Sequence, residues 1–298
     1  MNATELLDIV KSGESSKVQF KREFDNQEKI AAEMIAMSNA KGGMIVFGVE
    51  DKTGNIRVDE MIVPGTDEAD INKDKVTDYL KLLIKNSDES ESIPNDTVLY
   101  QNLNIIKKSN LTLGGLLFFA KDPQRFTPAF HVKAVAFYGN CLGGLHYRDS
   151  RDIVGVIPEI FRESMLFFKQ NLRHEQKGQN FNSVGILEIS EIALEELIRN
   201  ALIHRDYSNK EPIQLRVFDN RVEIISPGYL PNGLTVEKIK LGNMVIRNNI
   251  LASYAVRLIK FRGFGTGIIR ALKEQPNIEL TNDVEGEQFI VKIPREQV

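Results

Sequence analysis

Three polar residues stand at helical spacing in the segment EELIRNALIHRDY, residues 195–207: Glu196, Asn200 and His204. Residues four apart lie on one face of an α-helix, so these side chains are expected to form a single stripe. A carboxylate can orient or deprotonate a water molecule, and an asparagine oxygen can ligate a hard cation such as Mg²⁺. The spacing therefore predicts a polar site along one edge of a helix.

The same segment has the apolar residues of a helix that packs on a core. These form one arc: Leu194, Leu197, Ile198, Ala201 and Leu202. Side chains at the edge of that arc are partly shielded from water, where an unpaired amide or carboxylate costs free energy. Glu196 and Asn200 therefore need partners, either a ligand or ordinary backbone groups. We expect His204 to be structural, because it ends the helix and can bond to nearby backbone.

Two glycine-rich stretches follow this helix in the chain. SPGYLPNGL begins at Ser226 and contains Gly228, and GFGTG occupies residues 263–267, directly before a predicted helix. Glycines at such a position leave backbone N–H groups open to a phosphate, which the amino end of a helix also attracts. The helix and the two glycine loops together predict a fold built around a nucleotide pocket.

The order of these motifs resembles the GHKL ATPase superfamily, which has the Bergerat fold. LEELIRNALIHRDYS, RVEIISPGYLPNGL, IRNNILA and GFGTGI are similar to the divergent GHKL-like ATPase domain of bacterial transcriptional regulators, over about residues 183–298. The resemblance implies ATP and Mg²⁺ as cofactors, Glu196 as the general base and Asn200 as the Mg²⁺ ligand through the nucleotide. The cofactor-binding residues that it implies are Asn200, Ser226, Gly228, Gly263, Gly265, Thr266 and Gly267.

One residue departs from the pattern of this superfamily. In active GHKL ATPases an aspartate accepts a hydrogen bond from the adenine amino group, and the corresponding residue here is Ser226. Serine can accept that bond, but it brings no charge and a shorter reach. We therefore expect a site that binds a nucleotide without turning it over.

The first half of the chain carries a second set of motifs. ESSKVQFKREF, SNAKGGMIVFGVED and GGLLFFAKDPQRFTPAFHVKAVAFYG resemble the Schlafen/AlbA-like domain, over about residues 1–140. This resemblance implies nucleic-acid binding. The candidates for contact with the nucleic acid are Lys17, Lys21 and Arg22, although lysines on strand edges are often only solvated.

The Schlafen branch of that family also implies a metal-dependent ribonuclease built on three carboxylates. The three positions fall at Glu14, Gln19 and Asp51 in this chain. At such nuclease sites a hard divalent metal needs anionic oxygen ligands to hold it and the attacking water, and a glutamine supplies a neutral one. Glu14 and Asp51 are therefore a degenerate nuclease-like pair, and we do not expect nuclease activity.

Composition limits the class of protein. The chain has 38 Lys and Arg residues against 41 Asp and Glu residues, so its net charge of −3 gives no overall attraction to nucleic acid or membrane. The single cysteine, Cys141, excludes an internal disulfide and fits a reducing compartment. The amino terminus is not a signal peptide, and no apolar run approaches the roughly 20 residues of a membrane span. We expect a cytoplasmic protein with no membrane contact.

The pattern along the chain predicts an α+β protein with two domains. The expected division is an AlbA/Schlafen-like mixed α/β domain over 1–140, a helical connector over 141–182, and a GHKL-like α/β sandwich over 183–298. Helices are predicted at 4–11, from Glu28 to the stop at Gly42-Gly43, at 71–85, 153–174, 195–207, 235–240, 249–260 and after Gly267. Strands are predicted at 18–24, from Met44 to a turn at Thr53-Gly54, and at 97–106, 114–119, 131–138, 213–219, 221–227 and 288–294.

These expectations favour a nucleic-acid-associated transcriptional regulator whose second domain binds ATP, with conformation as its output. An enzyme is the first alternative, either an ATPase that uses Glu196 or a weak nuclease. The second is an interaction scaffold with both sites degenerate. GHKL relatives are commonly homodimers. Related regulators often have a winged helix after the ATPase domain, and its absence before Val298 argues against sequence-specific DNA binding.

Overall fold

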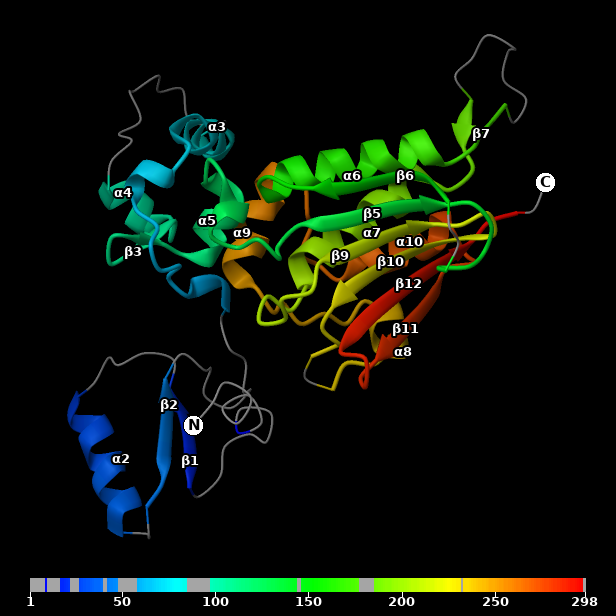
Figure 1. Cartoon of the computed structure of the whole chain (residues 1–298). Helices are drawn as coiled ribbons and strands as arrows, with labels where there is room; N and C mark the ends of the chain where they lie inside the picture. Colours follow the sequence, from blue (N-terminus) through cyan, green and yellow to red (C-terminus); the bar gives the residue numbers. More distant parts are fainter. Residues whose placement is uncertain are drawn as a thin grey trace. The chain divides into compact units, whose positions relative to one another are not determined.

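The computed structural model divides the chain into two compact units, Met1–Val58 and Asp59–Val298 (Figure 1). The residues that it describes are 9, 17–21, 27–39, 42–47, 58–84, 97–143, 146–176, 185–231 and 233–296. None of the helices within these ranges is both long enough and apolar enough to cross a bilayer.

In the first unit a helix connects two parallel strands. β1 (Val18–Lys21) pairs with β2 (Met44–Phe47), and α2 (Gln27–Asn39) lies between them in the chain. Phe20 and Val46 form the core of this unit, which confirms the helix and the two strands expected there. The helix expected at 4–11 and the turn expected at Thr53-Gly54 fall on residues outside the described ranges, apart from Ile9.

The second unit is built on a six-stranded mixed sheet with the order β11-β12-β10-β9-β5-β6. Its strands are β5 (Val132–Phe137), β6 (Tyr147–Ile153), β9 (Ile213–Val217), β10 (Arg221–Pro227), β11 (Glu279–Asp283) and β12 (Gln288–Pro294). β5 and β9 are parallel, and every other neighbouring pair is antiparallel. The strands predicted at 131–138, 213–219, 221–227 and 288–294 are confirmed.

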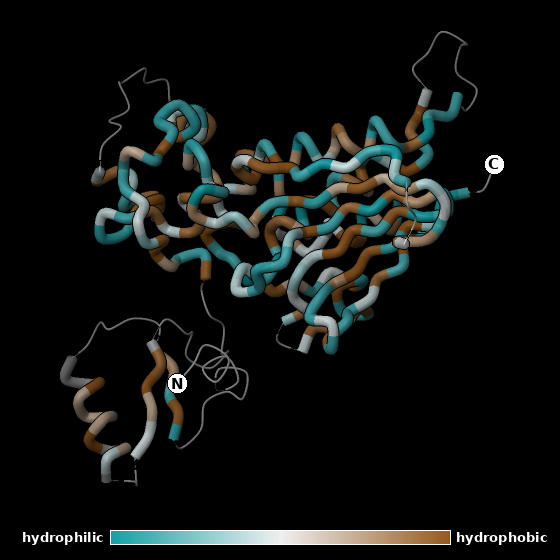
Figure 2. Tube along the Cα trace, in the orientation of Figure 1, coloured by the Kyte–Doolittle hydropathy of each residue, from teal (hydrophilic) through white to brown (hydrophobic). Residues whose placement is uncertain are grey.

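Strand register aligns a row of buried apolar residues across this sheet. Ala134 of β5 lies opposite Leu215 of β9, which lies opposite Ile224 of β10, which in turn lies opposite Val291 of β12. All four are buried, so the face that carries them needs a covering layer. On the other face the strands carry mixed residues, with Gln214 and Arg216 of β9 beside Ile225 and Glu223 of β10. Figure 2 shows hydrophobic residues concentrated in the strands of this sheet.

Helices supply that covering layer. Helices α6 (Ile157–Asn171) and α7 (Glu191–His204) pack against the sheet and against each other, and α10 (Thr266–Glu274) packs on α7 (Figure 1). The remaining helices are α3 (Lys73–Ile84), α4 (Thr97–Asn102), α5 (Leu113–Phe119), α8 (Val236–Lys240) and α9 (Asn249–Leu258). The 3₁₀ turns are Val58–Glu60, Glu68–Asp70 and Pro123–Arg125. Two small hairpins pair β3 (Ile106–Lys107) with β4 (Asn110–Leu111), and β7 (His174–Glu175) with β8 (Ile186–Leu187).

Two predicted strands are wrong. Residues 97–102 form α4, and residues 113–119, with the sequence LGGLLFF, form α5. All seven residues of α5 are buried, and the Thr112 side chain accepts a hydrogen bond from Gly115 N at its amino end. A short, continuous apolar run has no period that separates a buried strand from a buried helix, so the sequence pattern could not decide between them.

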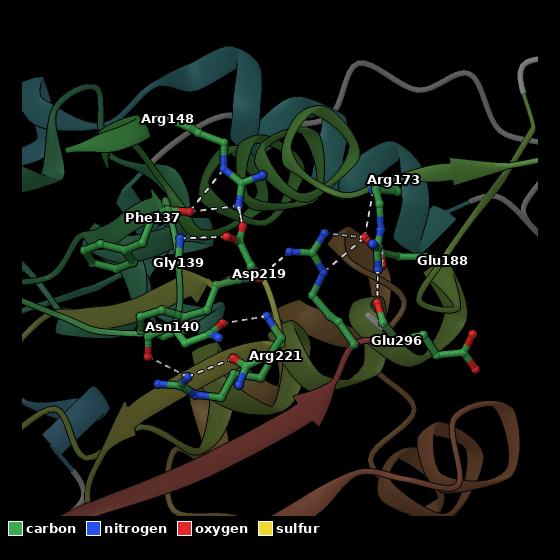
Figure 3. Close-up of polar contacts among 12 residues, drawn as sticks. Phe137, Gly139, Asn140, Arg148, Arg173, Glu188, Asp219, Arg221 and Glu296 are labelled. Carbon is green, nitrogen blue, oxygen red and sulfur yellow. Dashed lines mark hydrogen bonds and ion pairs between the residues drawn. The ribbon is translucent and has the colours of Figure 1, made fainter. Parts of the chain in front are cut away.

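The large sheet uses residues from both sides of the boundary expected near residue 140. The loop after β5 is tied to the turn between β9 and β10, because Asp219 accepts hydrogen bonds from Gly139 N at 2.7 Å and Arg148 Nη2 at 2.6 Å (Figure 3). The segment expected to be a connector supplies β6 and α6 to the same layers. The boundaries 1–140, 141–182 and 183–298 stay a prediction about domains, while the compact units divide at Val58 and Asp59.

A second polar cluster lies around Glu188, in the segment that precedes α7. The side chain of Glu188 is only 4% exposed and accepts hydrogen bonds from Arg173 Nη2 at 2.7 Å and from Arg295 Nη2 at 2.7 Å (Figure 3). These two guanidinium groups hold the pKa of Glu188 below its usual value against the opposing effect of burial. The cluster joins the segment before α7 to the end of β12.

A buried carboxylate caps α9 from far away in the chain. Asp59 Oδ2 accepts hydrogen bonds from Ile250 N at 2.6 Å and Leu251 N at 3.2 Å. Asn248 precedes that helix, and its side-chain amide instead donates to the carbonyls of Ile203 and Arg205 at 2.9 Å and 2.8 Å. Asp59 therefore stabilises the start of α9, which leaves Asn248 to bond to the end of α7.

Asp59→Asn is expected to remove part of the pH dependence of stability. Burial raises the pKa of Asp59 to about 6, so between about pH 4 and pH 6 the folded protein holds a proton that the unfolded chain releases. The free energy of unfolding therefore falls as the pH rises through this window, by at most about 3 kcal/mol from this carboxyl. Urea unfolding at pH 4 and pH 7 measures the loss, which should be smaller in the variant than in the wild type.

Asp74→Asn, at an exposed position in α3, is the control and should keep the wild-type difference between the two pH values. If the free energy of unfolding changes equally between pH 4 and pH 7 in Asp59→Asn and in the wild type, Asp59 is not the source of that change.

Candidate functional site

Helix α7 carries the polar stripe that the sequence analysis predicted. Ser190 accepts a hydrogen bond from Ala193 N at its amino end, and the helix ends at His204. Leu194, Leu197 and Ile198 are buried, as the apolar arc requires. Helix α7 packs on β10 and on α10. The polar stripe at the edge of its apolar arc therefore faces α10, the helix that follows the second glycine loop.

An open pocket lies at this edge. Glu196 and His204 line it. Six of the seven expected cofactor-binding residues also line it: Asn200, Ser226, Gly228, Gly263, Gly265 and Gly267. Thr266 is the first residue of α10 and is not among the lining residues. Residues from α7, β10, both glycine loops and the 243–245 segment therefore meet in one cavity.

Glu196 is buried, with only 4% of its surface exposed, and its partners are two arginines. Glu196 Oε1 accepts from Arg270 Nη1 at 2.6 Å and from Arg199 Nη1 at 3.3 Å. The other oxygen, Oε2, lies 2.8 Å from where a β-carbon on Gly267 would be. One carboxylate oxygen is therefore occupied by guanidinium groups while the other faces the start of α10.

Asn200 lies one turn further along α7 and faces the same glycine. Its Nδ2 atom is buried and has no hydrogen-bond partner among the described residues. A β-carbon on Gly267 would lie 3.1 Å from that atom, so glycine is what lets α10 approach here. Rotation of the amide by 180° presents Oδ1, an acceptor and cation ligand, at the same place. A buried amide without a partner next to a phosphate-type loop is the arrangement that a Mg²⁺-nucleotide would satisfy.

The amino end of α10 is open to an anion. Gly265 precedes the helix in a left-handed conformation, with φ of 70°, and makes no side-chain cap. The first N–H groups of an α-helix have no partner within the helix, and their dipoles favour negative charge. The loop is held by a close approach, since a β-carbon on Gly265 would lie 2.0 Å from Gly242 O.

The other end of the pocket is lined by Ser226, Gly228 and His204, and the ion pair of Arg247 with Asp206 lies beside Gly228. Ser226 is buried, and its hydroxyl donates to Ala201 O at 3.2 Å, which leaves its lone pairs as acceptors. His204 packs edge-on against Phe261 at 5.7 Å. Burial and the nearby charge of Arg247 lower the pKa of His204 to about 4, against a hydrogen bond with the Val245 backbone, so the ring is neutral at pH 7.

Both arginine partners of Glu196 were missed at the sequence level, although the sequence held a signal for one of them. Arg199 follows Glu196 by three residues on the same helix, which is a spacing that predicts an ion pair. Arg270 lies three residues after Gly267, and only the packing of α10 on α7 brings it to the carboxylate. The 243–245 segment was also missed, because a loop without polar periodicity carries no signal of its own.

Few of the nuclease and nucleic-acid candidates of the first unit can be placed. Lys17 is exposed and Lys21 is the last residue of β1, whereas Arg22, Glu14 and Asp51 lie outside the described residues. Gln19 has a buried Oε1 without a hydrogen-bond partner in the described part of the chain. Within the ranges that the structure describes, no three His, Cys, Asp or Glu side chains cluster as metal ligands do.

Comparison with known proteins gives two family matches. Residues 14–110 match the family described as "Schlafen, AlbA_2", and residues 210–293 match the one described as "Putative ATP-dependent DNA helicase recG C-terminal", an HATPase domain. The chain thus has a Schlafen/AlbA_2 domain followed by an HATPase domain, as its motifs indicated. The second match covers both glycine loops and begins after α7.

The fold also matches a solved structure. The DIP2311 protein from Corynebacterium diphtheriae aligns with a TM-score of 0.59 and 16% sequence identity, over 99% of this chain and 80% of that one. At this identity the likeness concerns the fold alone. No curated protein matches the chain.

Gly265→Ala is expected to destabilise the protein more than Gly263→Ala. The two residues have similar φ values, 70° and 66°, so each alanine pays about 1–2 kcal/mol for a left-handed backbone. A β-carbon at residue 265 also meets the Gly242 carbonyl, whereas at residue 263 the nearest atom is Phe261 Cε1 at 3.7 Å. Because backbone cannot move aside as a side chain can, we expect a further loss of about 1–3 kcal/mol. Equal urea midpoints for the two variants would contradict the close approach.

Proposed function

We propose that this protein associates with nucleic acid through its first domain and binds ATP with Mg²⁺ in the pocket of its second domain. The observation that carries the proposal is Asn200. Its buried amide lacks a partner among the described residues and faces the glycine at the start of α10. The HATPase match over 210–293 supports the same ligand class.

In this proposal the two ends of the pocket hold different parts of the nucleotide. The first N–H groups of α10, with Gly263, Gly265, Thr266 and Gly267, would hold phosphate oxygens. Asn200 would contribute an oxygen ligand to Mg²⁺, which neutralises phosphate charge when it is bound. At the other end Ser226 and Gly228 would lie against the base, with the Ser226 lone pairs free to accept from an amino group.

Binding with a conformational output is the first candidate activity. The pocket-lining segment 243–245 is followed by Asn248, which bonds to the end of α7 and precedes α9. The cap of α9 is Asp59, the first residue of the second unit. A change in the 243–245 segment on nucleotide binding would therefore reach the point at which the chain enters this unit.

Hydrolysis is the second candidate, and Glu196 is the observation that favours it. Glu196 Oε2 faces Gly267, beside the proposed phosphate site, as a general base would need. Glu196 Oε1 is bound to Arg270 and Arg199, which is why binding ranks first.

The proposed role of the first domain rests on the Schlafen, AlbA_2 match over 14–110. Lys17, Lys21 and Arg22 remain the proposed contacts with the phosphate backbone. Regulation of transcription is the process in which we propose that the two domains act together, with the nucleotide state altering the hold on nucleic acid.

Asn200→Ala is expected to weaken ATP binding at least tenfold. The variant removes the proposed Mg²⁺ ligand while leaving the apolar face of α7 in place, and tenfold corresponds to about 1.4 kcal/mol. Calorimetric titration of the whole chain with ATP and Mg²⁺ measures the effect. Asn277→Ala, at an exposed position outside the pocket, is the matched control. Absence of ATP binding by the wild type would overturn the proposal, and equal affinities of the wild type and Asn200→Ala would remove the role of Asn200.

Lys17→Ala is expected to weaken nucleic-acid binding and to reduce its salt dependence. Each phosphate neutralised by a lysine releases a counterion, so the loss of one contact lowers the slope of log affinity against log salt by about one. Titrations at several salt concentrations measure that slope. Lys81→Ala, which breaks a surface pair with Asp78 in α3, should keep the wild-type slope. A flat salt response of the wild type would count against nucleic-acid binding.

A further inference from the structure

Two arginines hold Glu196, and they differ in how firmly each is fixed. Arg199 donates Nε to Ile259 O at 2.7 Å and Nη2 to Glu195 at 2.6 Å, and its side chain is 8% exposed. It also lies over the ring of Phe161 at 4.9 Å. Arg199 is therefore fixed by contacts that do not involve the pocket.

Arg270 is the less constrained of the two. Its side chain is 34% exposed, and its polar partner within the described part of the chain is Glu196, at 2.6 Å. Because a third of its surface is exposed, water can solvate the Arg270 guanidinium when it leaves this ion pair. Glu196 would keep Arg199 as a partner after such a change.

Arg270 does not line the pocket as the structure stands, but it lies close to the residues of its phosphate end. It is the fifth residue of α10, and helical side chains incline toward the amino end of their own helix. The carboxylate of Glu196 lies between the Arg270 guanidinium and Gly267. Its Oε1 accepts a hydrogen bond from Arg270, and its Oε2 faces Gly267. The guanidinium therefore lies beside the first turn of α10.

A phosphate at this place is electrostatically favourable only if a cation neutralises its charge. A phosphate group bound between Gly267 and Asn200 would lie next to the Glu196 carboxylate, and two anions at close range repel. A planar guanidinium binds phosphate through two parallel hydrogen bonds and neutralises it. Arg270 can supply this group because it already lies against the carboxylate that causes the repulsion.

We propose that Arg270 selects a nucleoside triphosphate over the diphosphate. Arg270 leaves Glu196 for the terminal phosphate, and Arg199 retains the carboxylate. In the diphosphate complex no phosphate group reaches Arg270, which stays paired with Glu196. This inference rests on the proposed nucleotide binding and adds a residue that reads the number of phosphates.

Calorimetric titration with ATP and with ADP, each with Mg²⁺, tests the inference on the whole chain. The wild type is expected to bind ATP about tenfold or more tightly than ADP. In Arg270→Gln the affinity for ATP should fall about tenfold while that for ADP changes less than twofold, so that the ratio approaches one. Lys273→Gln, on an exposed position of the same helix, removes an equal charge and should keep the wild-type ratio.

Glu196→Gln separates selection from a merely structural role of the ion pair. Without its carboxylate partner Arg270 is free for the phosphate and the repulsion is gone, so the preference for ATP should exceed that of the wild type. In the double variant Glu196→Gln/Arg270→Gln, which leaves no unpaired carboxylate, the ratio should again approach one.

Three results would overturn the inference. They are an unchanged ratio in Arg270→Gln, an unchanged or smaller ratio in Glu196→Gln, and a wild type that binds both nucleotides equally. Each leaves the proposed nucleotide binding intact, whereas a wild type that binds neither nucleotide refutes both proposals at once.

Discussion

Helix α10 packs on α7 at Gly267, and the chemistry of the pocket depends on that contact. Any side chain at residue 267 would meet Glu196 Oε2 and Asn200 Nδ2 within about 3 Å. With glycine there, the first turn of α10 lies directly against the polar stripe of α7. The same approach brings Arg270 to Glu196, so the helix that opens a phosphate site also supplies a cation beside it.

The two ends of the pocket offer different groups to a ligand. Near α10, one buried carboxylate is shared between two guanidinium groups, and the amide of Asn200 is buried without a described partner. At the other end His204 is neutral because burial lowers its pKa, and Ser226 offers only lone pairs. A ligand with an anionic part and an uncharged aromatic part would match this division.

The pocket is also connected to the start of the second unit. The end of α7 is held by the Asn248 amide, and α9 begins under the cap of Asp59. Both groups are buried, and each has an oxygen without a described partner, Asn248 Oδ1 and Asp59 Oδ1. Buried polar groups that are only partly satisfied are places where a small rearrangement changes the free energy. A series of contacts through α7, Asn248 and α9 thus connects the pocket with Asp59, the first residue of this unit.

Periodicity in the sequence determined the elements that make the site. The apolar arc on residues 194–202 dictated helix α7 and its polar edge, and the glycines at 263–267 indicated the open start of a helix, because both signals are local. Local signals failed at LGGLLFF, where a uniformly apolar run formed a buried helix. Only the tertiary structure decided that Arg270 pairs with Glu196 and that Asp59 caps a helix 191 residues away. These contacts join residues distant in the chain, so they follow from how the layers pack and not from any spacing that the sequence displays.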